Sequence, residues 1–102
     1  MVKHIILWTL KPELQGAEKQ QVIDGMRTHL EGLKGQVPGL VDIHVYGGTT
    51  ALASSNADVM LDSTLESAEA LQAYAVHPAH VHVADTYVRP FTALRSCLDF
   101  EV

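Results

Sequence analysis

The opening run of the chain constrains the fold more than any other stretch, because it predicts a strand with two apolar faces. Ile5 and Leu7 lie on one face of an extended chain here, while Ile6, Trp8 and Leu10 lie on the other. A strand that is apolar on both faces is usually covered on both faces. Any sheet that contains this strand must therefore bury two surfaces.

The rest of the chain alternates between helical and extended patterns, separated by proline and glycine. Pro78 interrupts the second helical pattern, because proline lacks the amide hydrogen that a helix needs. Ser63 or Thr64 is the expected N-cap of that second helix. The patterns predict strands at 2–10, 40–46, 58–65 and 91–100, and helices at 15–34, 66–75 and 79–87. This βαββαβ order predicts an α+β, ferredoxin-like fold: a single domain over 1–102 with an antiparallel four-stranded sheet and both helices on one face.

The two helices leave the other face of the sheet open. The last predicted strand is also apolar on both faces, with Ala93 and Cys97 alternating with Leu94 and Leu98, and Cys97 is expected to be buried. A monomer rarely leaves so large an apolar patch in water. The sequence therefore predicts a homodimer in which two sheets pack face to face as a dimeric α/β barrel.

The charge and composition of the chain exclude several classes of binding partner. The formal net charge is −5, and the seven Lys and Arg residues are scattered, which argues against nucleic acid and against an anionic membrane surface. The apolar start is too short for a signal peptide or a membrane span. A single cysteine excludes an internal disulfide framework, so a cytoplasmic location is expected.

The stretch Tyr-Ala-Val-His-Pro-Ala-His-Val-His, from Tyr74 to His82, concentrates titratable side chains. With Pro78 at the first position of a restarted helix, His77 becomes the cap and His80 lies in the first turn. The positive end of the helix dipole favours a neutral imidazole, which is what a general base needs. Tyr74 is then a hydrogen-bond donor for a substrate carbonyl.

Other interpretations of these residues stay open. The histidines and Tyr74 also suit a purely structural helix, and His77, His80 and His82 with Asp85 form a weak candidate metal site. In a helix, however, His82 points away from His77 and His80, because residues two positions apart lie on different sides.

Two residues outside this stretch are candidates for the same site. His4 shares the more apolar face of the first strand, where it is either a core residue or a pocket wall facing His80. Asp58 is a candidate to orient one of these imidazoles through a carboxylate–histidine hydrogen bond.

Four motifs together carry a resemblance to a known family. They are an opening Val-Lys-His-Ile-Ile-Leu-Trp, a Pro-Gly-Leu before the second strand, the Tyr-x-x-His-Pro-x-His core, and a closing Leu-Asp-Phe. In this order, over nearly the whole chain, they resemble the stress-responsive dimeric α/β-barrel domain family. The resemblance implies a ferredoxin-like protomer that dimerises through its sheet.

The resemblance also implies a function. The best understood member of that family is a plant polyketide cyclase that needs no cofactor and uses a cavity between sheet and helices. By this resemblance His80 is the general base, Tyr74 its partner at the carbonyl, His77 a supporting residue and His4 part of the cavity wall. The remaining candidates for the pocket and its support are Asp58, Trp8, Met26 and Met60. Two hypotheses follow: proton abstraction, aldol-type cyclisation or isomerisation of a small apolar or carbonyl-rich ligand, or a non-catalytic stress-response or ligand-binding module.

Overall fold

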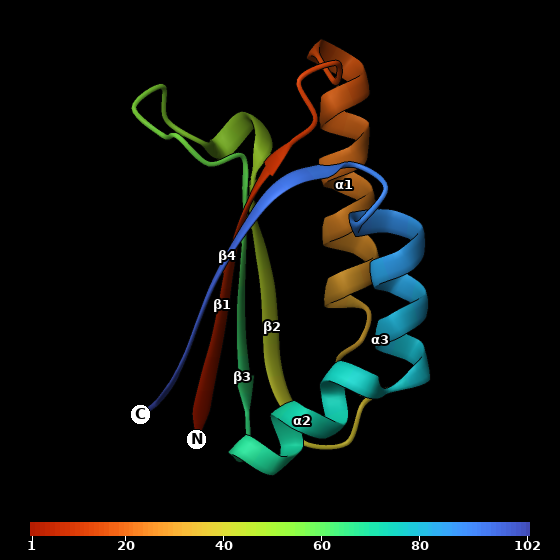
Figure 1. Ribbon diagram of the computed structural model, residues 1–102, viewed down its shortest axis with the longest axis vertical. Helices are drawn as coiled ribbons and strands as arrows, with labels where there is room; N and C mark the ends of the chain where they lie inside the picture. Colours follow the sequence, from red (N-terminus) through yellow and green to blue (C-terminus); the bar gives the residue numbers. More distant parts are fainter.

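One antiparallel sheet and a single layer of helices make up the protein, whose computed structural model describes residues 1–102 (Figure 1). The strands are β1 (Val2–Leu10), β2 (Leu40–Gly47), β3 (Val59–Leu65) and β4 (Thr92–Glu101), and they lie in the order β2-β3-β1-β4. The helices are α1 (Gly16–Glu31), α2 (Ala68–Val76) and α3 (Pro78–Val83), with short helical turns at Gly48–Thr50 and Ala84–Val88. All neighbouring strands are antiparallel, which confirms the predicted ferredoxin-like βαββαβ fold.

The core lies between the sheet and the helices. The alternation of β1 directs Ile6, Trp8 and Leu10 towards the helix layer, where all three are buried. Together with apolar residues of α1 and the other strands they form one hydrophobic cluster. Its most deeply buried aliphatic members are Ile23, Met26, Leu33, Leu61 and Leu65. Burial of these side chains contributes most of the folding free energy, at roughly 1.5–3 kcal/mol for each one fully buried.

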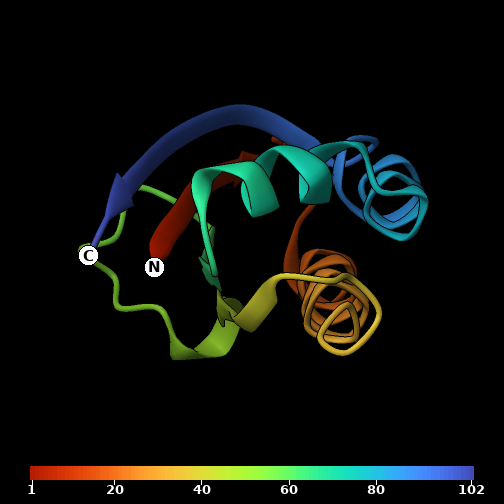
Figure 2. The same ribbon diagram turned by 90° about the horizontal axis from the view of Figure 1, so that it is seen from below.

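The break at Pro78 turns the chain between two short helices. The residue before a proline disfavours the helical region, and His77 is extended at φ −64° and ψ 132°. The His77 side chain accepts a hydrogen bond from the backbone N–H of Ala79, which confirms that it caps the restarted helix. As a result α2 lies across the end of the sheet, whereas α3 runs alongside α1 (Figures 1 and 2).

Three features of the helices differ from the prediction. The first helix ends at Glu31 rather than at residue 34, because Gly32 already forms its C-cap. The N-cap of α2 is Ser67, since Ser63 and Thr64 still belong to β3. The last helical turn, Ala84–Val88, is π-helical, with the N–H of Arg89 donating to the Ala84 carbonyl.

The sheet face opposite the helices carries exposed apolar side chains. Leu94 is 69% exposed and Leu98 is 64% exposed, and the β1–β4 register puts both on the side of Ile5 and Leu7. Cys97 points to the helix side but is also exposed, which corrects the expectation of a buried cysteine. The reason is that β4 is an edge strand, with all but its first residue exposed.

No helix in the structure is both long enough and apolar enough to cross a membrane.

Alanine substitutions at two glycines would measure how closely α2 packs against the turn that precedes β2. Gly39 and Gly35 both adopt positive φ, at 85° and 88°, so alanine at either position is strained by about 1–2 kcal/mol. At Gly39 a new Cβ would lie 2.7 Å from the Cβ of Ala70 in α2, whereas at Gly35 nothing lies within 4 Å. Gly39→Ala should therefore lower the free energy of unfolding by a further ~1–3 kcal/mol in urea titrations. Equal losses in the two variants would mean that α2 does not press on this turn.

Candidate functional site

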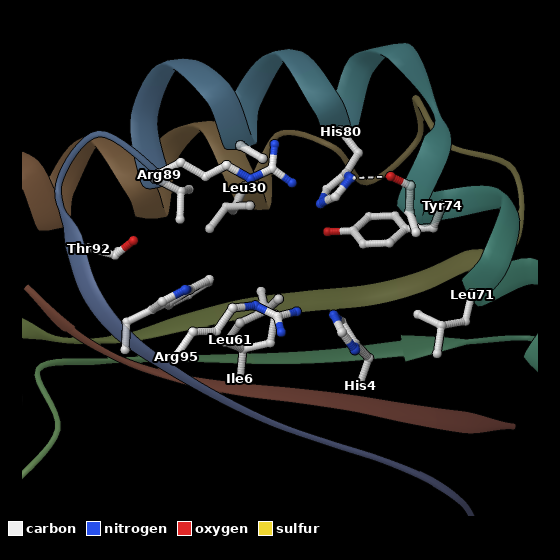
Figure 3. Close-up of a pocket in the computed structure, with 14 residues that line it drawn as sticks. His4, Ile6, Leu30, Leu61, Leu71, Tyr74, His80, Arg89, Thr92 and Arg95 are labelled. Carbon is white, nitrogen blue, oxygen red and sulfur yellow. Dashed lines mark hydrogen bonds between the residues drawn. The ribbon is translucent and has the colours of Figure 1, made fainter.

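A cavity of about 210 Å³ lies between the sheet and the helices (Figure 3). Its walls come from every layer of the fold, and most of its lining is apolar. The residues that line it are His4, Ile6, Trp8, Leu30, Leu61, Leu71, Tyr74, Ala75, His80, Ala84, Val88, Arg89, Thr92 and Arg95. No carboxylate is among them, so the polar groups that face the cavity are neutral or cationic.

Tyr74 lies at the end of α2 and directs its hydroxyl into this cavity (Figure 3). The residue is 1% exposed, and its hydroxyl has no hydrogen-bond partner within the protein. Leaving a buried hydroxyl unpaired costs about 1–3 kcal/mol, so a ligand that accepts a hydrogen bond from this group would recover that free energy. Burial raises the pKa of Tyr74, which keeps the phenol protonated and able to donate.

His80 faces Tyr74 across the break between α2 and α3, with the two ring centroids 4.2 Å apart. Its Nδ1 lies 3.2 Å from the carbonyl oxygen of Ala75. Because a carbonyl only accepts, Nδ1 carries the hydrogen and Nε2 is left with a free lone pair. Burial lowers the pKa of His80, and the positive charges of Arg89 and Arg95 lower it further. The imidazole is therefore kept neutral.

His4 lies on the sheet side of the cavity, with its ring centroid 6.1 Å from that of Tyr74. It is buried, and its Nδ1 forms a short hydrogen bond with Oδ1 of Asp99. Partial burial would raise the pKa of Asp99, but the hydrogen bond and charge of His4 outweigh it and hold this pKa below its usual value. The carboxylate fixes the orientation of the imidazole and leaves Nε2 available.

Asp58 does not orient a histidine, which corrects the prediction made for it. Its carboxylate accepts from the backbone N–H of Leu10 at 2.8 Å and from Lys19 Nζ at 2.8 Å. It thus ties the end of β1 to α1. The β1–β4 register decides which acid meets the imidazole, because it pairs His4 directly with Asp99.

The other predicted pocket residues divide between several places. Trp8 lines the cavity, as the prediction requires. His77 caps α3 and lies outside the lining. Met26 of α1 is fully buried in the core and does not line the cavity, which corrects the prediction made for it. Met60 pairs with Leu7 on the opposite face of the sheet, so its predicted place in this pocket is wrong.

The candidate metal ligands also change. His77, His80 and His82 are not brought together with Asp85, whereas donor atoms of His4, Cys97 and Asp99 lie within 4.8 Å of one another. Partial burial and the neighbouring Asp99 raise the pKa of the Cys97 thiol, which disfavours the thiolate that a metal would bind. Three donors also fall short of the four that a structural zinc site takes.

Sequence reasoning missed Asp99 and two arginines. Arg89 follows the π-helical turn and Arg95 lies on the helix side of β4, opposite Trp8, and both line the cavity. Asp99 and Arg95 could have been found only from the antiparallel pairing of β1 with β4, which places them opposite His4 and Trp8. The start of β1 lies beside the end of β4, where the N–H of Val102 donates to the Met1 carbonyl. Nothing in the helical periodicity indicated the π-turn that precedes Arg89.

Known proteins share this fold and part of this sequence. Olivetolic acid cyclase of Cannabis sativa is 32% identical over 89 residues, which cover 84% of this chain and 82% of the cyclase. A dimeric ferredoxin-like protein of unknown function from Bacteroides fragilis superposes with a TM-score of 0.90 at 25% identity, covering 99% of this chain and 95% of that chain. A hydroxynitrile lyase of Passiflora edulis shares the fold alone, with a TM-score of 0.75 at 17% identity over 97% of this chain and 90% of that one. The pattern that describes the Stress responsive A/B Barrel Domain matches residues 2–102, and the chain therefore belongs to that family.

Proposed function

We propose that the protein is an enzyme that removes a proton from the carbon next to a carbonyl group in a small substrate. His80 is the general base, and Tyr74 donates a hydrogen bond to the carbonyl oxygen. His4, held by Asp99, lines the site and orients the substrate. The reaction that follows is an aldol-type cyclisation or an isomerisation of the resulting enolate.

The observation that carries the proposal is the meeting of a neutral imidazole and an unpaired phenol at one small cavity. A general base must be unprotonated near neutral pH, and burial together with nearby positive charge lowers the pKa of His80. Its free Nε2 is the atom that would accept the proton, because Nδ1 is engaged with Ala75. A base with these properties accelerates proton transfer by roughly 10²–10⁴-fold.

Tyr74 supplies the second requirement, which is stabilisation of negative charge on the substrate oxygen. Its hydroxyl is buried and unpaired, so a hydrogen bond to an enolate oxygen gains more here than it would in water. Its raised pKa means that it donates a hydrogen bond without losing the proton. The proton taken by His80 is returned to the new alkoxide in a cyclisation, or to another carbon in an isomerisation.

The family relative supports the cyclisation in particular. Olivetolic acid cyclase is 32% identical to this chain and is a cyclase by name. Binding of a carbonyl compound without any turnover is the outcome expected of a ligand-binding module instead.

We further propose that two copies of the chain pack through the open face of the sheet. Leu94, Leu98 and Phe100 of β4 share this face with Leu7 of β1, and all four are exposed in the single chain. A contiguous apolar patch of this kind marks an interaction surface. The Bacteroides fragilis protein of the same fold is described as dimeric, which supports the same assembly here.

The role of His80 is testable without knowing the natural substrate. Deuterium incorporation next to the carbonyl of small ketones and keto acids in D₂O, followed by NMR, measures proton abstraction directly. The wild type should catalyse exchange, and His80→Ala should lower the rate by at least ~100-fold. His82→Ala is the matched control, since His82 is an exposed histidine on the same helix and should leave the rate unchanged.

The pH dependence of the same exchange gives a second readout. Because the pKa of His80 is lowered, mainly by burial, the exchange rate should fall with decreasing pH, as the imidazole becomes protonated, and this fall should lie at lower pH than the titration of a free imidazole. The charges that contribute to lowering the pKa of His80 are those of Arg89, His4 and Arg95. Equal exchange by wild type and His80→Ala at every pH would overturn the proposal.

Tyr74→Phe separates catalysis from stability. Removing an unpaired hydroxyl should leave the urea unfolding free energy within about 1 kcal/mol of wild type, or raise it. The exchange rate should nevertheless fall by roughly 10²–10³-fold, the effect of losing one hydrogen-bond donor to a developing oxyanion. Tyr46→Phe, at an exposed tyrosine on β2, is the control. A large loss of stability in Tyr74→Phe with unchanged exchange would contradict the assigned role.

The dimer is tested by adding one charge to the open face. Leu98→Asp should convert a dimer to a monomer in sedimentation velocity, because the carboxylate would be buried unpaired at the interface. Leu52→Asp adds the same charge at a side chain that is 75% exposed in a loop, and it should remain dimeric. A wild type that sediments as a monomer at micromolar concentration would refute the interface.

A further inference from the structure

The cavity contains a cationic end that the proposed proton transfer does not use. Arg89 enters from the end of the π-helical turn and Arg95 enters from β4, so two separate elements bring guanidinium groups to the same cavity. In Figure 3 the Arg89 group extends towards His80 on the helix side of the cavity, and the Arg95 group extends towards His4 on the sheet side. Both arginines are exposed in the single chain, so solvent screens their mutual repulsion in part, and an anion bound between them would relieve the remainder.

Within the chain, no carboxylate pairs directly with Arg95. Arg95 forms no ion pair in the structure, whereas Arg89 pairs with Asp85 on the exposed side of its helical turn. Asp99 lies on the same strand face as Arg95, and the charge of Arg95 helps to lower the pKa of Asp99, but the Asp99 carboxylate is hydrogen-bonded to His4 and forms no ion pair with Arg95. The positive cavity stands out because the chain as a whole has a net charge of −5.

The size of the cavity limits what the anion belongs to. A volume of about 210 Å³ lies below the range of roughly 300–1,000 Å³ that is usual for small-molecule pockets. This space fits a short carbon chain or one ring with its polar substituents. A nucleotide or another large phosphorylated carrier does not fit inside it.

We propose that the substrate of this site is a small keto acid, whose carboxylate is held by Arg95 with help from Arg89. The inference rests on the proposed function, since it assigns the substrate class of the same site. The carboxylate lies at the β4 end of the cavity, which directs the ketone oxygen to the unpaired Tyr74 hydroxyl and the adjacent carbon to Nε2 of His80. A planar carboxylate matches the paired N–H groups of a guanidinium, which fixes orientation as well as charge. The apolar side chains around Ile6 and Leu61 enclose the carbon chain.

A matched set of ligands tests the charge directly. 4-Oxopentanoate and 4-oxopentanamide have the same shape and differ by one negative charge, and 3-oxobutylphosphonate replaces the carboxylate with a phosphonate. Titrations of ¹⁵N-labelled protein at pH 7.5, followed by NMR, report both affinity and location. The acid should bind roughly five- to tenfold more tightly than the amide, with the largest shifts at pocket residues.

Variants of Arg95 assign the preference to that side chain. Arg95→Gln should bind the acid and the amide about equally, and Arg95→Lys should retain part of the preference because it keeps the charge but not the paired N–H geometry. Lys34→Gln is the control for net charge, since its ammonium pairs with Asp42 on the far edge strand, and it should behave like wild type. Binding of the acid should also raise the pKa of His80, because the anion offsets the arginine charges, whereas the amide should not.

Several outcomes overturn the inference. These are equal binding of acid and amide by wild type, a preference that survives in Arg95→Gln, or an acid that shifts no pocket residue. Tighter binding of the phosphonate would assign the site to phosphoryl compounds instead of carboxylates. The result is separable from the proposed function, because His80→Ala should keep the preference for the acid while losing proton exchange.

Discussion

The site depends on one constraint, the missing amide hydrogen of Pro78. Without it the helix that begins at Ala68 ends at Val76, and the chain passes through an extended His77 before a new helix starts in a different direction. The turn brings the Tyr74 ring, at the end of one helix, within 4.2 Å of the His80 ring in the next. These residues are six positions apart in sequence, and in a continuous helix they would lie on different faces. His77 stabilises the arrangement by capping the new helix.

The chemistry of the cavity follows from burial and from an uneven distribution of charge. Burial and two nearby arginines both oppose protonation of His80, so the imidazole stays neutral while the cavity as a whole is cationic. The Tyr74 hydroxyl is buried and has no hydrogen-bond partner within the protein, so it is free to donate to a ligand in the cavity. Folded proteins retain such unpaired groups mainly where a ligand completes them, and this is the feature that joins the proposed proton transfer to a bound carbonyl.

Most of the fold was predictable from the sequence, because it rests on local periodicity. The order of helices and strands along the chain, the antiparallel sheet and the cap at His77 follow from alternation, from helical spacing and from proline. The errors were also local. The first helix ended early at Gly32, and Ser67 rather than Ser63 or Thr64 capped the second, because helix ends depend on backbone geometry that single residues specify weakly. The π-helical turn before Arg89 left no periodic signal at all.

The site was predictable only in part. The sequence by itself determined the Tyr74, His77 and His80 group, since these residues are close along the chain and a proline sets their geometry. Only the tertiary structure decided that Asp99, and not Asp58, holds His4, and that Met60 lies on the opposite face. It also decided that Arg95 enters the cavity from β4. The physical reason is strand register, because a shift of one residue moves every side chain to the other face, and register is set by the packing of the whole sheet.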